Sequence, residues 1–242
     1  MKKIAILRRL GLPVQSIKEV LDGKGQAILY KVSESKRLEI EAEKLKQALV
    51  QQLAEKQDWG YINSQLEVLE KSQTILQRML NVFPGYYGKY ISLHFARYLN
   101  EPIVCDEQQE AFETVIDFLD NVSFDFPSDL QQYLDDITRD FDGSFVENVF
   151  ANMNNAICDT EKYMADNKEI LEQYMQFKQS EEFKASPAYR LQELLRKLNS
   201  ENGYDTTFIP AMKKLSLSYR KYHDGLEKAN EVFLSKYPNA TL

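Results

Sequence analysis

The feature that most constrains the fold is a stretch of more than thirty residues, from Gln26 to about Gln57, without glycine or proline. Within it, apolar residues recur at a spacing near ~3.5 residues and form a narrow seam between charged and glutamine side chains. Such a seam predicts a long helix that needs a partner helix. At ~1.5 Å per residue this helix would reach roughly 45 Å, too long for a small domain to cover alone. The seam consists of Leu38, Ala42, Leu45 and Leu49.

Polar residues on or near the seam favour an antiparallel contact between two such helices over a long parallel zipper. Elsewhere the chain has only 9 Gly and 7 Pro among 242 residues, and 43% of its residues are hydrophobic. So few glycine and proline residues cannot supply the turns that many short strands need, and enough apolar residues are present to form a core. We therefore expect an all-α protein whose long helix is followed by a multi-helix C-terminal bundle.

The sequence contains no pattern typical of a membrane span or of a leader peptide. No run of about 18 apolar residues predicts a membrane span, and the basic N-terminal segment lacks the apolar stretch of a leader peptide. The two cysteines, Cys105 and Cys158, form no pair or Cys/His cluster. We therefore expect a cytoplasmic protein in a reducing compartment, without a membrane partner.

Charge is distributed unevenly along the chain. The net charge is −7, yet residues 1–37 hold nine basic and three acidic residues. A basic segment on an acidic protein is typical of a local nucleic-acid contact. The N-terminal end is therefore the candidate nucleic-acid end.

Two short helices are predicted at the N-terminus. Ile4, Leu7 and Leu10 share one helical face, Gly11 suits a C-cap, and Pro13 suits the first turn of the next helix. We expect the Asp22–Gly25 segment to end the second helix, and Trp59-Gly60 to end the long one. Further helices are expected over residues 62–80, 86–99, 106–121, from 127, 144–183 with a break near 166–167, 186–199 and 205–236.

The segment from Ile4 to Asp22 resembles the MerR family of transcription regulators. That family has an I-x-x-L-R-x-L-G pattern followed by a hydrophobic segment and Ile-Lys, at the end of its winged helix-turn-helix domain. The dimerisation helix comes next. The resemblance covers about a quarter of the chain. The matching positions here are Ile4, Leu7, Arg8, Leu10, Gly11, Ile17, Lys18 and Leu21.

The resemblance implies a homodimer through residues 26–59 and a helical effector-binding domain over 60–242. Residues 1–25 would be the remnant of the DNA-binding domain, because the family's first helices and first wing have no counterpart here. We expect a shortened chain or a misplaced start rather than a natural derivative. The resemblance further implies phosphate contacts by Arg8, Arg9, Gln15, Ser16 and Lys18, although these residues fit a solvated helix face equally well.

Aromatic residues crowd the segment 83–98. Tyr87, Tyr90, His94 and Tyr98 follow one side of a predicted helix, and Tyr86 lies beside them. Such rings can line a pocket for a small-molecule effector, but they also fill ordinary helical cores, which is the more common arrangement.

The sequence shows no catalytic motif. The two histidines, His94 and His223, belong to no metal-binding pattern, and no glycine-rich phosphate loop occurs. We therefore expect no enzyme activity, no cofactor and no metal.

The interpretation favoured by the sequence is an effector-responsive, MerR-like regulator that binds promoter DNA in its full-length form. Two alternatives stay open. The chain could be a dimeric interaction protein that pairs with a full-length regulator without binding DNA itself. It could also be a helical small-molecule carrier or enzyme that happens to begin with this motif.

Overall fold

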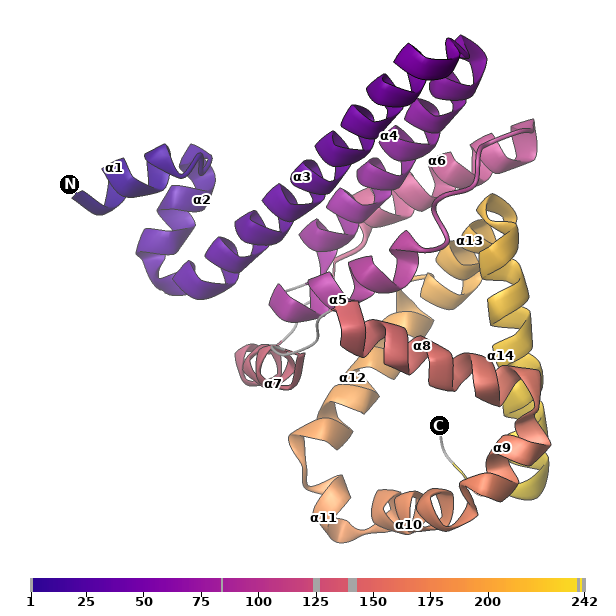
Figure 1. Ribbon diagram of the computed structural model, residues 1–242. Coiled ribbons are helices and arrows are strands. Elements are labelled where there is room, and N and C mark those ends of the chain that lie inside the picture. The colour runs from indigo at the N-terminus through magenta and orange to yellow at the C-terminus, as the bar shows by residue number, and fades with distance from the viewer. Residues whose placement is uncertain (1, 84, 124–126, 139–142, 239, 241–242) are drawn as a thin grey trace. The chain divides into compact units, whose positions relative to one another are not determined.

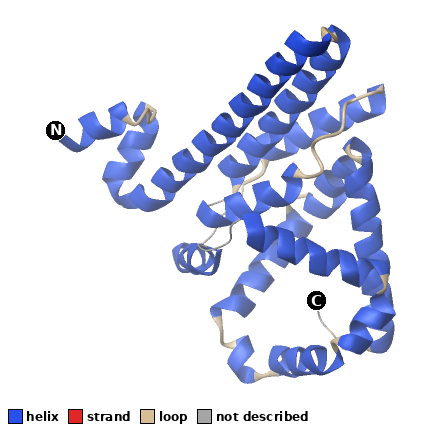
Figure 2. Cartoon of the chain, in the orientation of Figure 1, coloured by secondary structure: helices blue, strands red, loops and turns tan. Residues whose placement is uncertain are grey.

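The computed structural model describes residues 2–83, 85–123, 127–138, 143–238 and 240. Figure 2 shows that this described part is built from helices and loops without a strand. The all-α prediction is therefore confirmed. None of the described helices is long and apolar enough to cross a membrane.

The chain divides into two compact units. Unit 1 comprises Met1–Pro102 with Leu134–Arg139, and unit 2 comprises Ile103–Tyr133 with Asp140–Leu242. The expected segments 1–25, 26–59 and 60–242 were defined by their expected functions, whereas the two units are defined by how compactly the chain packs. The functions of the three segments stay predictions. Helix α7 (Ser128–Thr138) contributes residues to both units.

Unit 1 is dominated by a helical hairpin. The helices α3 (Gly25–Lys56) and α4 (Trp59–Val82) lie side by side along most of their length (Figure 1). The Asp58 side chain caps α4 by accepting a 3.0 Å hydrogen bond from the Tyr61 amide, which satisfies one of the free N–H groups of the first turn. Helix α5 (Gly85–Ala96) packs against both long helices.

The N-terminal module, defined here as residues 2–37, contains α1 (Lys2–Arg9), α2 (Val14–Glu19) and the first turns of α3. Gly11 has φ +80° between the two short helices, the left-handed conformation expected of a glycine C-cap. Leu7, Leu12 and Ile17 form a small buried cluster at their junction. The helix pair predicted from the sequence is therefore present.

Two predicted helix ends are wrong. The helical conformation does not end at Asp22–Gly25, because the π-helical turn η1 (Val20–Lys24) joins α2 directly to α3. Trp59 and Gly60 do not close the long helix, but form the first turn of α4. The reversal occurs at Gln57, with φ +51°, and at Asp58.

Unit 2 is centred on the packing of α6 (Asp106–Asn121) against α13 (Ile209–Leu215). Val115, Phe208, Met212 and Leu215 are almost fully buried there. The other helical elements of unit 2 are α8 (Gly143–Cys158), α9 (Thr160–Asp166), α10 (Lys168–Gln179), α11 (Glu181–Lys184), α12 (Pro187–Glu201), η2 (Tyr204–Phe208) and α14 (Leu217–Lys236).

Several predicted boundaries in unit 2 are confirmed. Helix α6 covers the predicted residues 106–121, α9 gives way to α10 around Asn167, and α12 begins at Pro187. The prediction of one helix over 205–236 is wrong. A break at Ser216 separates α13 from α14, and the Ser216 hydroxyl caps the new helix by accepting a 3.1 Å bond from the Tyr219 amide.

Candidate functional site

The N-terminal module presents its basic side chains to solvent. Arg8 and Arg9 form the last turn of α1, Lys18 lies on α2, and all three are exposed. Gln15 is also exposed, but its amide donates a 2.9 Å bond to Glu19, and Ser16 is half-buried. The two short helices, which pack through Leu7, Leu12 and Ile17, therefore carry the three cationic side chains on their surface.

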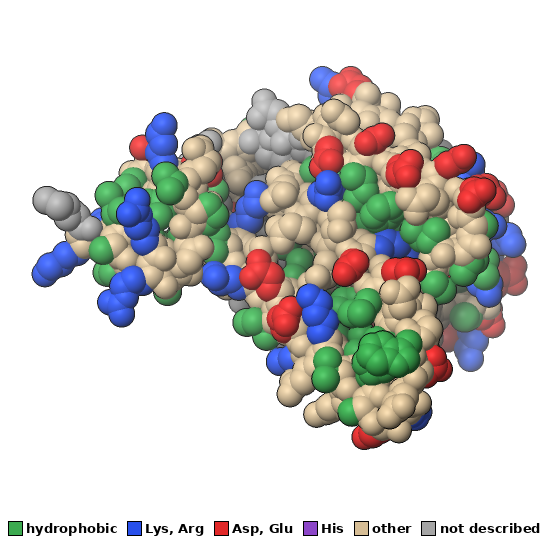
Figure 3. All heavy atoms as spheres, turned by 90° about the horizontal axis from the view of Figure 1, so that it is seen from above, with side chains coloured by type: hydrophobic (Ala, Val, Ile, Leu, Met, Phe, Trp, Pro, Cys, Tyr) green, Lys and Arg blue, Asp and Glu red, His purple; other side chains and the backbone are tan. Residues whose placement is uncertain are grey.

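Lys36 is an additional basic residue that the family pattern did not identify. A Cβ placed on Gly11 would lie 3.1 Å from Lys36 Nζ, so this ammonium group rests on the turn between α1 and α2. Figure 3 shows Lys and Arg side chains around the N-terminal end of the chain, with apolar side chains between them. Lys36 reaches this site only because α3 packs against the turn. The spacing of residues in the sequence therefore could not identify Lys36 as part of the site.

The α3 seam lies along a groove in unit 1. Leu38 and Ala42 are buried, Leu49 is half-buried, and Leu45 is 54% exposed. All four line a groove of about 400 Å³ between α3 and α4, and residues 96, 99 and 100 line it as well. The partner helix that the seam requires is thus partly supplied by α4 of the same chain, and an exposed strip remains.

Helix α5 carries the predicted aromatic set except Tyr98, which lies two residues beyond its end at Ala96. Tyr87 stacks on Tyr90 with ring centroids 6.3 Å apart, and His94 lies 5.9 Å from Tyr98. Tyr98 is buried, whereas Tyr87, Tyr90 and His94 are half-buried. The side chain of Tyr86 lies outside the described residues. These rings pack on one another and do not line the α3–α4 groove.

Burial changes the protonation of this aromatic set. Desolvation, with a smaller contribution from the nearby Arg97 charge, lowers the pKa of His94 to about 4. Desolvation, with a smaller contribution from Tyr90, raises the pKa of Tyr87 to about 12. His94 is therefore a neutral ring at physiological pH.

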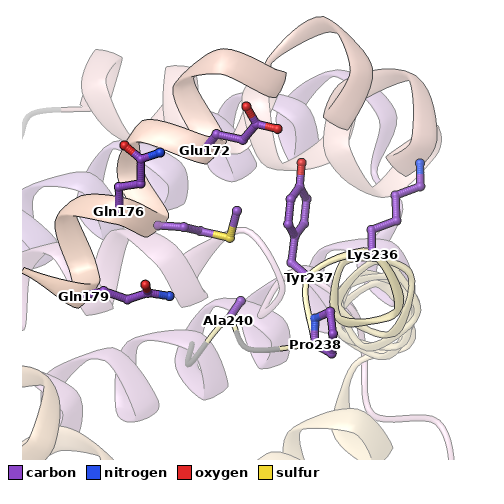
Figure 4. Close-up of a pocket in the computed structure, with 8 residues that line it drawn as sticks. Glu172, Gln176, Gln179, Lys236, Tyr237, Pro238 and Ala240 are labelled. Carbon is purple, nitrogen blue, oxygen red and sulfur yellow. The ribbon is translucent and has the colours of Figure 1, made fainter.

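Two other cavities are formed by described residues of unit 2. One, of about 340 Å³, lies between α10 and the C-terminal segment. Figure 4 shows Glu172, Gln176 and Gln179 along one helix, with Tyr237 and Pro238 opposite. The other, of about 560 Å³, is lined by polar residues from 152 to 167 at the junction of α8 and α9. Neither gathers residues with a recognisable catalytic arrangement.

One cluster of metal-ligand type occurs among the described residues. His223, Asp224 and Glu227 on α14 place one ligand atom each within 4.8 Å of the others. Lys213 Nζ already lies 2.5 Å from Asp224 Oδ1 and 3.2 Å from Glu227 Oε2. Because this ammonium group pairs with both carboxylates, the cluster is explained as an ion-pair network between α13 and α14.

No protein-family model, curated protein or solved structure matches this chain. The assignment of function consequently depends on the residues and their geometry.

Proposed function

We propose that the chain is a MerR-like, effector-responsive regulator of transcription that acts as a homodimer. The observation that carries this proposal is the N-terminal module. On a protein of net charge −7, Arg8, Arg9 and Lys18 lie on one short helix pair, and the Lys36 ammonium group lies against the turn between its two helices. Guanidinium and ammonium groups at helix ends bind phosphate, and such contacts position a protein on DNA without reading its sequence.

The proposed dimer forms through the exposed strip of the α3 seam. Leu45 lines the groove and is 54% exposed, so a second copy of the hairpin would bury it. A two-fold contact places the same residues on both sides, which suits an antiparallel pairing of α3 helices. In this proposal a small-molecule effector acts on the pair of subunits and thereby changes its binding to promoter DNA.

Salt-dependent DNA binding tests the nucleic-acid part of the proposal. We expect weak binding of a short duplex, measured by fluorescence anisotropy, with little sequence preference and a steep loss of affinity as salt increases. Replacing Arg8, Arg9 and Lys18 by Gln removes three cations from the module and should reduce the log–log salt slope by roughly 2–3, at ~0.9 per phosphate contact. The matched control replaces three exposed lysines elsewhere by Gln, namely Lys44, Lys221 and Lys228.

The control variant should retain the wild-type salt slope. Equal losses in both variants would mean that net charge alone governs the interaction, and the proposed module contact would be wrong. A dimer that binds no DNA at any salt would instead favour the alternative of a dimeric partner protein.

Light scattering tests the dimer. Leu45 and Ile40 lie on the same helix and are 54% and 56% exposed, but only Leu45 lines the groove. We expect Leu45→Glu to produce monomers because a charge would be buried in the contact, and Ile40→Glu to remain dimeric. A wild-type monomer at micromolar concentration would refute dimerisation.

A further inference from the structure

The α3–α4 groove has the dimensions and rigidity of a small-molecule site. Its volume of about 400 Å³ falls within the ~300–1,000 Å³ typical of ligand pockets. Three of its lining residues, Ala42, Leu76 and Leu99, are 3%, 6% and 0% exposed and belong to the packed core of unit 1. Since close-packed side chains hold their positions, the walls are formed before any ligand binds.

The polar groups of the groove indicate a neutral ligand. Glu41 is the ionisable residue among the lining residues, and its carboxylate accepts a 2.7 Å bond from Arg37. The side chains of Gln65, Ser72 and Asn100 form no hydrogen bond with any other described residue. The groove thus offers amide and hydroxyl groups beside apolar walls, without a free charge to recognise an anion.

We propose that this groove binds a neutral, largely apolar small molecule of two or more rings that carries hydrogen-bonding groups at its edge. Leu38, Leu45 and Leu69 supply apolar surface from the two helices, and the amides of Gln65 and Asn100 orient the polar edge. The site is distinct from the aromatic set of α5, whose rings contact one another.

A regulatory consequence follows and rests on the proposed dimer. The residues that a second copy would cover are the residues that the small molecule contacts, notably Leu45 and Leu49. One surface cannot hold both, so the bound molecule shifts the equilibrium from dimer to monomer by mass action. The monomer has half the phosphate contacts and therefore a lower affinity for DNA.

Two fluorescent dyes with the same ring system test the proposal on the full chain. N-phenyl-1-naphthylamine is neutral, and 1-anilinonaphthalene-8-sulfonate adds one anionic group to the same skeleton. We expect the neutral dye to bind with enhanced, blue-shifted emission, and the sulfonate to bind at least roughly tenfold more weakly, a difference of about 1.4 kcal/mol.

Two substitutions on α3 locate the binding. Ala48 and Ala54 are both exposed, but only Ala48 lines the groove. Ala48→Trp should fill the groove and reduce the affinity for the neutral dye roughly tenfold or more, whereas Ala54→Trp should leave it within about twofold. Circular dichroism of each variant confirms that the helices are intact, and Gln65→Leu provides a second, nearly isosteric change that should weaken binding.

The outcomes separate the site from the dimer. Dye binding that Ala48→Trp does not reduce, or that the sulfonate matches, overturns the proposed site. Dye binding that depends on Ala48, in a protein that light scattering shows to be monomeric throughout, supports the site and refutes the dimer. A dimer that persists when the groove is saturated with the neutral dye contradicts the regulatory consequence.

Discussion

The hydroxyl of Ser35 on α3 donates a 2.8 Å hydrogen bond to Oε1 of Gln77 on α4, across the hairpin of unit 1. A second, longer bond of 3.4 Å joins Gln73 Nε2 to the carbonyl oxygen of Leu38, one helical turn away. Apolar contacts alone tolerate a sliding of one helix along the other, whereas these directional bonds do not. Together they fix the register in which the groove forms.

Removal of the Ser35 hydroxyl should destabilise the hairpin. We expect Ser35→Ala to lower the free energy of unfolding by about 1 kcal/mol, because the Gln77 amide loses a partly buried partner. Urea titration followed by circular dichroism measures the change. Ser64→Ala is the control, since that exposed hydroxyl bonds only to a carbonyl of its own helix and should change stability much less. A loss of equal size in both variants would contradict the proposed role of the interhelical bond.

His94 should make stability depend on pH between about 4 and 6.5. Its pKa in the folded state is about 4, against an ordinary value of 6.5, so the unfolded chain takes up a proton in this range and the folded chain does not. Stability contributed by the neutral ring is present above pH 6.5 and is lost as pH falls toward 4. The loss is on the order of 2 kcal/mol once the partial exposure of the ring is considered.

Urea titrations at pH 7.5, 5.5 and 4.5 would measure this dependence. His94→Phe keeps an aromatic ring without the titrating group and should show a smaller fall in stability than the wild type. Parallel profiles for wild type and His94→Phe would show that carboxylates account for the whole effect.

Gly225 should not tolerate alanine. A Cβ at this position on α14 would lie 2.5 Å from Cγ2 of Ile157 on α8, and the β-branched Ile157 side chain has little freedom to move. We expect Gly225→Ala to destabilise the protein by about 1–3 kcal/mol through overpacking, although alanine is the better helix former.

Gly60→Ala provides the comparison. Its Cβ would meet its nearest atom, Asp58 Oδ1, at 3.7 Å, an ordinary contact in the exposed first turn of α4. This variant should be neutral or more stable by up to about 1 kcal/mol. A thermal melt that places Gly225→Ala at or above the wild-type Tm would show that α8 and α14 pack less closely than described.

Gln57 is expected to accept glycine with a gain in stability. It has φ +51° at the reversal between α3 and α4, a conformation that costs a residue with a Cβ more than it costs glycine. We expect Gln57→Gly to raise the free energy of unfolding by roughly 0.5–1 kcal/mol. Gln51→Gly, at an exposed helical position of α3, should lower it by about 1 kcal/mol, and the opposite ranking would exclude a left-handed Gln57.

Local signals in the sequence determined the helical content and several boundaries. Gly11 adopts the left-handed C-cap conformation, α6 spans residues 106–121, and Pro187 begins α12. Each of these features depends on side chains within one or two helical turns, where glycine, proline and capping residues act directly on the backbone. The same reasoning failed at Asp22–Gly25, because two glycines weaken a helix without forcing it to end.

Tertiary structure alone decided what the seam of α3 contacts and which residues gather into a site. The spacing of Leu38 and Ala42 predicted a partner helix, but only the turn at Gln57 and Asp58 directs α4 of the same chain onto them and leaves Leu45 exposed. The groove with Asn100 and the position of Lys36 beside Gly11 likewise depend on residues far apart in the sequence. The periodic spacing of apolar residues indicates that one face of a helix must be buried. Which surface buries that face depends on long-range packing within the whole unit.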